Sequence, residues 1–326
     1  MNRLLIISAF LIFQITYSQF YKKSEPFIHT YSIVARDSVT GEMGVAVQSH
    51  WFSVGSLAIY GEAGVGVVAT QAMVDPSYGP KGLVLMKQGM MPQEALNKLL
   101  NGDNGSMFRQ VAFLNKNGDV AAHTGSSCID EAGHFIGKNF SVQANMMLKN
   151  TVWDAMAQAF QTSKGTLSER ILAAMKAAEA EKGDIRGKQS AAILIVKPEA
   201  SGNKWEDTVM DLRVEDNENP IVELERLMTI HRAYNFMSKG DIAMEEGDSM
   251  AAERHYLMAQ QLFPDNLEMQ YWYAINLITN KDFDKAKPIL KRVFKADSNW
   301  KILTQRLVKV NMLIISEADL ETVLDL

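Results

Sequence analysis

The chain has 326 residues, of which 47% are hydrophobic and 22% charged, and its formal net charge is −5 at pH 7. These proportions are those of an ordinary globular protein and exclude a chain that is disordered by composition. The length favours two structural units with an ample core. Because binding to nucleic-acid phosphates requires clustered Lys and Arg, the mildly acidic balance predicts no nucleic-acid partner.

Residues 1–19 have the layout of a signal peptide, with Arg3 near the start, an apolar run from Leu4 to Ile15, and small or polar residues up to Ser18. The apolar run is shorter than the roughly 20 residues that a membrane-spanning helix needs. The sequence therefore predicts export to the periplasm or the medium through a cleaved signal peptide, with no stable membrane anchor. An uncleaved anchor is the alternative interpretation.

Strand patterns alternate with helix patterns between residues 29 and 216. Apolar runs around turn residues predict β-hairpins, and spacings of three and four predict amphipathic helices. The small-residue run from Gly55 to Gln71 predicts a strand packed closely against a second sheet. The other predicted strands lie in Tyr31–Ala35, Met43–Gln48, Phe108–Thr124, Phe140–Met146, Ser190–Val196 and Val209–Val214, and the helices in Lys81–Leu100, Val152–Phe160 and Leu167–Lys182.

This order of elements predicts the fold class. Paired strands followed by helices indicate an α+β protein in which two antiparallel sheets are covered by helices, a four-layer αββα sandwich rather than a parallel doubly wound sheet. The polar segment from Asp216 to Pro220 suits a domain boundary. The sequence thus predicts a signal peptide over 1–19, an α/β domain over 29–216 and a small all-α domain over 220–326.

The segment beyond Pro220 shows helix patterns and an internal period. Asp248 and Ala252 recur thirty-four positions later as Asp282 and Ala286, which is the period of a tetratricopeptide repeat. Because isolated repeats cannot bury their apolar faces, we expect this tail to pack on the α/β domain or to bind a protein partner.

Thr30, at the start of the first predicted strand, is the strongest candidate for a nucleophile. In N-terminal-nucleophile (Ntn) enzymes a Thr, Ser or Cys opens a core strand, and removal of the preceding residues frees an α-amine that serves as its base. Ser32 lies on the same face, as a supporting hydroxyl or alternative nucleophile. Both residues equally suit a structural role in a sheet. Because signal-peptide removal leaves residues ahead of Thr30, a free amine requires a second cleavage.

Two amide side chains, Gln143 and Asn145, share one face of a predicted strand. They suit hydrogen-bond donation to an oxyanion, or mutual hydrogen bonding across a sheet. Asp184 and Arg186 precede another buried strand, which Gln189 enters. This charged pair suits either the orientation of a substrate carboxylate or the anchoring of the loop.

The single cysteine, Cys128, lies between His123 and His134. A lone cysteine excludes an intramolecular disulfide. The three residues could supply a thiolate nucleophile or a zinc site. Their gaps of five and six residues differ from the usual zinc spacings, and a lone cysteine is commonly a buried apolar residue. We therefore expect neither a metal nor another cofactor.

Blocks of sequence such as HTYSIVARD, GEMGVAVQS, GVGVVATQA, PSYGPKGL, RQVAFLN, FSVQANMM and GDIRGKQSAA follow in order between His29 and about His231. Through these blocks the chain resembles the bacterial family called domain of unknown function 1028, of the Ntn-hydrolase-like superfamily. The resemblance implies an αββα sandwich and an ancestry among amide-bond hydrolases. The chain departs from the family in placing Thr30 inside the chain instead of beside an initiator Met.

The sequence is compatible with two functions. One is a secreted Ntn-type amidohydrolase or peptidase acting on a small amide, and the other is a catalytically silent ligand-binding or assembly protein whose helical tail recruits a partner. For the enzyme, the candidate catalytic residues are Thr30, Ser32, Asp37, His123, Gln143 and Asn145, and the candidate substrate-binding residues are Gln71, Tyr78, Asp184, Arg186 and Gln189.

Overall fold

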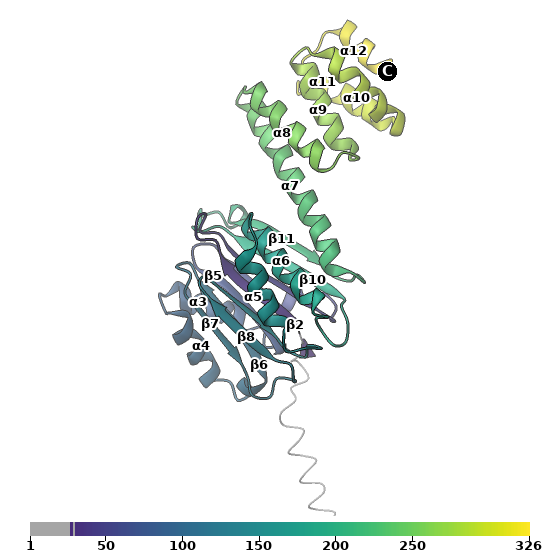
Figure 1. The fold of residues 1–326 in the computed structure, drawn as a ribbon. Helices are drawn as coiled ribbons and strands as arrows, with labels where there is room; N and C mark the ends of the chain where they lie inside the picture. The colour runs from purple at the N-terminus through teal and green to yellow at the C-terminus, as the bar shows by residue number, and fades with distance from the viewer. Residues whose placement is uncertain (1–26, 29) are drawn as a thin grey trace, which may run out of the picture. The chain divides into compact units, whose positions relative to one another are not determined.

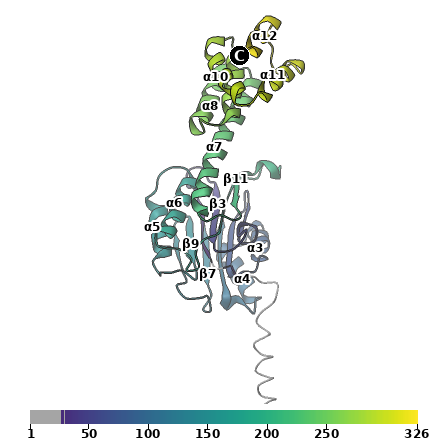
Figure 2. The same cartoon turned by 90° about the vertical axis from the view of Figure 1, so that its right-hand side faces the viewer.

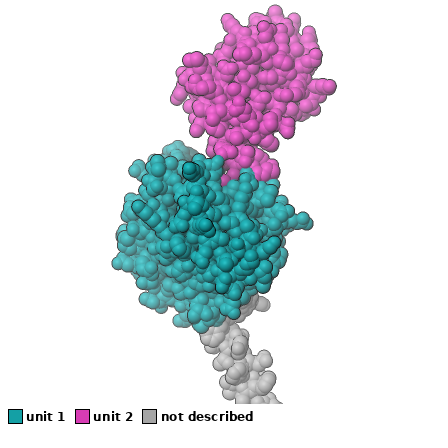
Figure 3. All heavy atoms as spheres, in the orientation of Figure 1, with its two compact units in different colours: residues 1–225 teal, residues 226–326 magenta. Residues whose placement is uncertain are grey.

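The structure is a computed structural model that describes residues 27–28 and 30–326. The predicted signal peptide and His29 lie outside the described residues. The chain divides into two compact units, Met1–Glu225 and Arg226–Leu326, which are coloured separately in Figure 3. The division falls inside helix α7 (Pro220–Glu245), beyond the polar segment that the sequence marks as a boundary.

The first unit contains two antiparallel sheets (Figure 1). The five-stranded sheet has the order β1-β5-β6-β7, with β4 also paired to β5, and the six-stranded sheet has the order β11-β10-β3-β2-β9-β8. Their strands are β1 (Phe27–Ile28), β2 (Thr30–Arg36), β3 (Met43–Ser49), β4 (Ile59–Glu62), β5 (Gly66–Met73), β6 (Arg109–Asn115), β7 (Val120–Thr124), β8 (Gly133–Gly137), β9 (Phe140–Ala144), β10 (Ser190–Val196) and β11 (Thr208–Val214).

Helices cover the outer faces of both sheets. Helices α5 (Val152–Thr162) and α6 (Leu167–Ala180) pack on the six-stranded sheet, whereas α3 (Tyr78–Lys87) and α4 (Pro92–Asn101) pack on the five-stranded sheet. Figure 2 shows the layers in sequence, from α5 and α6 through the sheets to α3 and α4. The predicted four-layer αββα arrangement is confirmed.

The space between the sheets is apolar along most of its length and polar at one end. Val34, Val45 and Val47 belong to the buried cluster between the sheets. Because side chains alternate between the two faces of a strand, Thr30 and Ser32 share the inner face with Val34. Both are fully buried. The inner face of β2 is therefore polar where the strand begins and apolar further on.

Three stretches differ from the sequence predictions. The run from Gly55 to Gln71, expected as a strand, contains the short helix α2 (Gly55–Ala58), strand β4, a turn and most of strand β5. The single helix expected over Lys81–Leu100 is two helices, because Gly89 has φ +90° and Pro92 opens α4 as its first residue. Strand β8 was not predicted, and glycines stand at both of its ends. One of them, Gly133, has a packing reason: a Cβ atom there would lie 2.8 Å from the ring of Trp153.

Every regular element among the described residues of the second unit is a helix. The unit contains α8 (Ser249–Leu262), α9 (Leu267–Thr279), α10 (Phe283–Ala296), α11 (Asn299–Lys309) and α12 (Glu317–Leu324), preceded by most of α7. The side chains of Asp248 and Asp282 cap α8 and α10 by accepting from the N–H of Ala251 and Lys285. The two capped helices thus repeat the thirty-four-residue period, and the tetratricopeptide assignment stays a prediction.

No helix among the described residues is both long enough and apolar enough to cross a membrane.

The packing of the five-stranded sheet predicts the effect of a core truncation. Phe113 of β6 is fully buried and lies where a Cβ on Gly82 of α3 would collide with its ring. Phe113→Ala should lower the free energy of unfolding by about 3–5 kcal/mol, measured by urea denaturation. Phe52 is 63% exposed, so Phe52→Ala should change it by less than about 0.5 kcal/mol. Equal losses in the two variants would contradict the packing described.

Candidate functional site

Three fully buried polar side chains join the two sheets where β2 begins. Ser32 Oγ donates a hydrogen bond of 2.6 Å to Gln71 Oε1 on β5 and accepts one of 2.7 Å from Gln143 Nε2 on β9. An amide oxygen is not a base that can activate a hydroxyl for attack. This arrangement suits Ser32 to a supporting role, one of the two that the sequence allows.

Gln110 on β6 is the centre of the same network. Its Oε1 accepts from Gln71 Nε2 at 2.6 Å and from Asn145 Nδ2 at 2.9 Å. Its Nε2 donates to Thr124 Oγ1 at 2.8 Å and to the carbonyl of Ala144 at 2.9 Å. Sequence reasoning missed Gln110, although a glutamine at an inward position of the apolar run RQVAFLN is a signal that could have found it.

Thr30, the first residue of β2, is also part of this network. Its carbonyl oxygen accepts from the backbone N–H of Asn145 at 3.1 Å and from Gln71 Nε2 at 3.2 Å. Just before it, Ile28 pairs with Ala72 in the other sheet. The chain therefore passes from one sheet to the other immediately ahead of Thr30, and donors from both sheets hold the main chain of Thr30.

The two predicted oxyanion donors are engaged in this chain. Gln143 Nε2 donates to Ser32, while Asn145 Nδ2 donates to Gln110 and lies 3.4 Å from the Thr30 carbonyl oxygen. The structure thus brings together Thr30, Ser32, Gln71, Gln143 and Asn145 from the sequence-predicted set. Their cluster is uncharged, because every one of these side chains is a hydroxyl or an amide.

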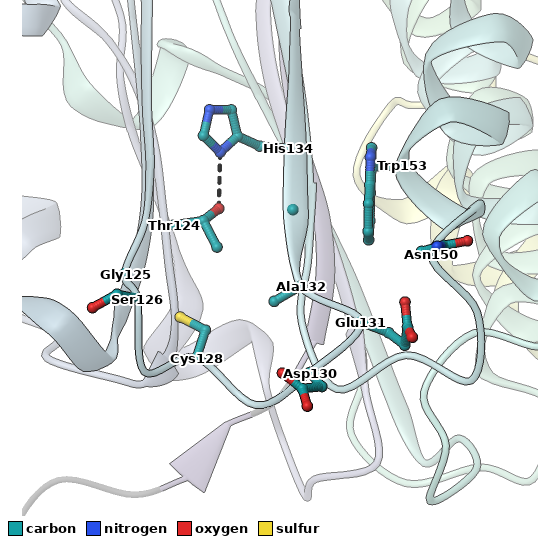
Figure 4. A pocket seen from close by; sticks show the side chains of 11 residues that line it. Thr124, Gly125, Ser126, Cys128, Asp130, Glu131, Ala132, His134, Asn150 and Trp153 are labelled. Atoms are coloured by element: carbon teal, nitrogen blue, oxygen red, sulfur yellow. Dashed lines mark hydrogen bonds between the residues drawn. The ribbon is translucent and has the colours of Figure 1, made fainter.

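The network reaches the protein surface at the edges of the sheets. Thr124 ends β7, an edge strand of the five-stranded sheet, and His134 lies on β8, an edge strand of the six-stranded sheet. Thr124 Oγ1 and His134 Nδ1 are 2.8 Å apart and hydrogen-bonded (Figure 4). Desolvation of the half-buried ring, and to a lesser degree the neighbouring His123, lower the pKa of His134 below its ordinary value. The imidazole is therefore neutral at pH 7.

A cavity of about 780 Å³ opens beside this pair and is called the edge pocket below. Its walls come from the loop that joins β7 to β8, from the strand ends on either side of that loop, and from the start of α5 (Figure 4). Two carboxylates face it, and none of the described residues that line it is Lys or Arg. Its lining includes Thr124, Ser126, Cys128, Asp130, Glu131, His134 and Trp153.

The structure does not assemble the alternative thiol or zinc sites. Cys128 Sγ donates to the carbonyl of Arg109 at 3.4 Å, and burial raises the pKa of the Cys128 thiol to about 11. His123 Nε2 is bonded instead to the carbonyl of Ser106 at 2.9 Å. Within the described part of the chain, no group of three or more His, Cys, Asp or Glu side chains is arranged to hold a metal ion.

Asp184 and Arg186 form an ion pair with each other. Arg186 Nη2 lies 2.6 Å from Asp184 Oδ2, and Arg186 Nε donates to Asp184 Oδ1 at 3.0 Å. Asp184 also accepts from the N–H of His50, which fixes the loop against the end of β3. This geometry favours the loop-anchoring alternative over a carboxylate clamp. Gln189 lies nearby but donates to Asp216 at 3.0 Å.

Two further predicted residues lie apart from the network. Asp37 sits in the β2–β3 turn, at the opposite end of β2 from Thr30, and accepts from the N–H groups of Val39 and Thr40 at 2.8 Å. Tyr78 is on α3, where its hydroxyl donates to Asp103 at 3.1 Å. The pattern of local polar residues could not distinguish a turn carboxylate or a helix-bound tyrosine from a pocket group.

With the geometry established, comparison with known proteins identifies the family. The model of the Family of unknown function (DUF1028) matches residues 30–224. The chain belongs to this family. The crystal structure of a DUF1028 protein from Silicibacter pomeroyi is similar at 33% sequence identity and a TM-score of 0.56, covering 61% of this chain and 88% of that one. The resemblance seen in the sequence is thereby confirmed.

A second solved structure, Anbu (ancestral beta-subunit) from Yersinia bercovieri, is 10% identical and covers 60% of this chain and 92% of that one, with a TM-score of 0.32. A score of that size does not establish a common fold. No curated protein matches the chain.

The central position of Gln110 predicts a large effect of its truncation. Gln110→Ala would leave the buried amides of Gln71 and Asn145 without their acceptor, so the free energy of unfolding should fall by about 1–3 kcal/mol. Gln93 on α4 is a matched control, because it is exposed and bonds only locally to Asn97. Gln93→Ala should change stability by less than about 0.5 kcal/mol in the same urea titration. Similar losses in both variants would show that the network adds nothing to the free energy of unfolding.

The ion pair between Asp103 and Arg109, which the Tyr78 hydroxyl also contacts, predicts that the stability of the fold depends on pH. Burial tends to raise the pKa of Asp103, but hydrogen bonds from the Arg109 guanidinium and the Gly105 N–H outweigh it, and the pKa is lowered overall. A lowered folded-state pKa means that the ionised carboxylate stabilises the fold above about pH 3.9, and that this contribution is lost as pH falls through the folded-state pKa.

Asp103→Asn should therefore destabilise the protein at pH 7 and bring its stability closer to that of the wild type near pH 3. Urea denaturation at both pH values measures the difference in free energy of unfolding between the variant and the wild type. A difference that stays constant or widens toward acid would contradict this sign.

Proposed function

We propose that the first unit is an amide hydrolase of the Ntn type, which becomes active when the chain is cut immediately before Thr30. The observation that carries the proposal is the crossing of the chain from β1, in one sheet, to Thr30 at the start of β2 in the other. A cut at that point would leave a threonine as the first residue of a core strand, with hydroxyl and amide side chains from both sheets around it.

The proposed chemistry uses the freed amine of Thr30 as the base. With a pKa of about 7.7–8.0, such an amine has a useful neutral fraction near pH 7. It takes the proton of Thr30 Oγ1 as that oxygen attacks the amide carbon, and it then delivers the proton to the leaving nitrogen. Water hydrolyses the resulting ester. In this scheme Asn145 Nδ2, which lies 3.4 Å from the Thr30 carbonyl oxygen, is assigned as the donor to the developing oxyanion.

The surroundings of Thr30 favour a neutral substrate group. Ser32, Gln71, Gln110 and Gln143 are fully buried and carry no charge. A charged group placed among them would lose its hydration without gaining a partner of opposite charge, which is strongly unfavourable. A small neutral amide or a peptide bond therefore fits this end of the sandwich. Export of the enzyme to the periplasm or the medium, through the predicted signal peptide, is part of the same proposal.

A binding or assembly protein is the second candidate, and two observations favour it. Thr30 is fully buried. The second unit also contains a cavity of about 490 Å³ lined by Tyr256, Trp272 and Met312 among others. Aromatic and methionine side chains of this kind are common where proteins bind partners. In this alternative the helical tail recruits the partner and the first unit is not an enzyme.

Maturation distinguishes the two candidates. Intact mass and N-terminal sequencing should be measured on the wild-type protein secreted by its own host, beside Thr30→Ala and Thr30→Ser treated identically. For the enzyme, the wild type and Thr30→Ser should begin at residue 30, whereas Thr30→Ala should keep the preceding residues and hydrolyse no amide. Ser32→Ala is the matched control and should still be cut. Chains that all begin upstream of Thr30 and stay uncut would rule out the Ntn mechanism.

A further inference from the structure

We propose that Thr124 and His134 form a second reactive centre, in which the Thr124 hydroxyl takes up an acyl group from a small ester or activated amide bound in the edge pocket. This centre lies on the surface and uses none of the chemistry of Thr30. The inference therefore stands apart from the proposed Ntn activity.

The first support is the way in which the Thr124 hydroxyl is held. Gln110 Nε2 donates to Thr124 Oγ1 at 2.8 Å, and His134 Nδ1 lies 2.8 Å from the same oxygen. Thr124 is paired with Gln110 in the β6–β7 ladder, and His134 is paired with Gln143 in the β8–β9 ladder. Backbone pairing thus fixes both members, so the hydroxyl and the imidazole are oriented before any ligand arrives.

The second support is the protonation state of the imidazole. Because the pKa of His134 is lowered by desolvation and by His123, the ring is neutral at pH 7. Its Nδ1 can then accept the hydroxyl proton, while the amide of Gln110 supplies a donor to the oxygen. A hydroxyl within hydrogen-bond reach of a neutral imidazole is the arrangement that activates serine and threonine nucleophiles.

The reaction balances with these two residues and water. Thr124 Oγ1 forms a bond to the acyl carbon as its proton moves to His134 Nδ1. The bond between the acyl carbon and the leaving oxygen or nitrogen then breaks, and the leaving group takes the proton from His134. Water, deprotonated by His134, attacks the acyl ester, and the proton returns to Thr124. Gln110 Nε2 donates to the threonine oxygen at each stage.

Two other nucleophiles, Ser126 and Cys128, line the edge pocket. The thiol of Cys128 donates to a backbone carbonyl and has a pKa of about 11, so it stays protonated and weakly nucleophilic at pH 7. Ser126 lies in the loop beyond β7. Figure 4 shows the Thr124–His134 bond on one side of β8, with Cys128 below it.

The charges around the pocket indicate which acyl donor fits. Asp130 and Glu131 line it, and none of its described lining residues is Lys or Arg. Trp153 adds an aromatic ring, which is held against β8 because Gly133 has no Cβ. Carboxylates and an indole ring both attract cations. We therefore expect a donor that carries an ammonium group to react faster than a neutral or anionic one.

The test uses the full-length protein with p-nitrophenyl esters of glycine, butyrate and succinate, which are cationic, neutral and anionic. Release of p-nitrophenolate gives the rate, and intact mass with peptide mapping locates the acyl group. The acyl group should appear on Thr124. The glycine ester should react roughly two- to fivefold faster than the neutral one, as expected for partly exposed ion pairs, and Glu131→Gln should reduce this preference.

Variants separate the centre from its neighbours. Thr124→Val should abolish acylation, and Thr124→Ser should preserve it, which shows that the pocket still folds. His134→Gln should slow acylation by about 10²-fold or more, because the amide keeps a hydrogen-bond acceptor but is not a base. Ser126→Ala and Cys128→Ala should still be acylated on Thr124. Acylation of edge-pocket residues that persists in Thr124→Val, or that maps to Ser126 or Cys128, would overturn the proposal.

Discussion

The need to satisfy polar groups buried between two sheets is the constraint on which this domain depends. An unpaired amide in such a place costs about 1–3 kcal/mol, so each partner in the network contributes to the stability of this end of the sandwich. Gln110 meets this need because its one carboxamide serves both sheets, accepting from Gln71 and Asn145 and donating to Thr124. The alignment of the sheets and the geometry of both proposed centres therefore rest on the same side chain.

The architecture was predictable from the sequence because strand and helix periods differ and the chain keeps them apart. The α/β domain, its antiparallel pairing and the helical tail all followed from those patterns and from the blocks that resemble DUF1028. The unpredicted break between α3 and α4 at Gly89 and the unpredicted strand β8 share a cause. Turn glycines and short edge strands such as Gly133–Gly137 carry too few apolar residues to show a period.

The candidate site was predictable only in part, for a different reason. Strand alternation placed Ser32 with Thr30, and Asn145 with Gln143, and the structure gathers all four. Contacts between the sheets are long-range and leave no local pattern, so the links from Gln110 to Asn145 and from Thr124 to His134 could not be seen. Asp37 is a different case, because its partners are the nearby N–H groups of Val39 and Thr40 in its own turn, and a sequence pattern does not distinguish a turn carboxylate from a pocket carboxylate.

The proposed cut before Thr30 would also separate strand β1 from the rest of the chain. Phe27 and Ile28 pair with Met73 and Ala72 at the end of β5, next to Gln71, while β4 covers the other part of that edge. Ala72 has φ +70°, an unusual backbone conformation for alanine. Departure of these two residues would free only that short stretch of edge, too little to template strand pairing between molecules. Gln71, one of the amides near Thr30, directly precedes Ala72 in β5, so one cleavage would both create the nucleophile and detach the strand that pairs beside Gln71.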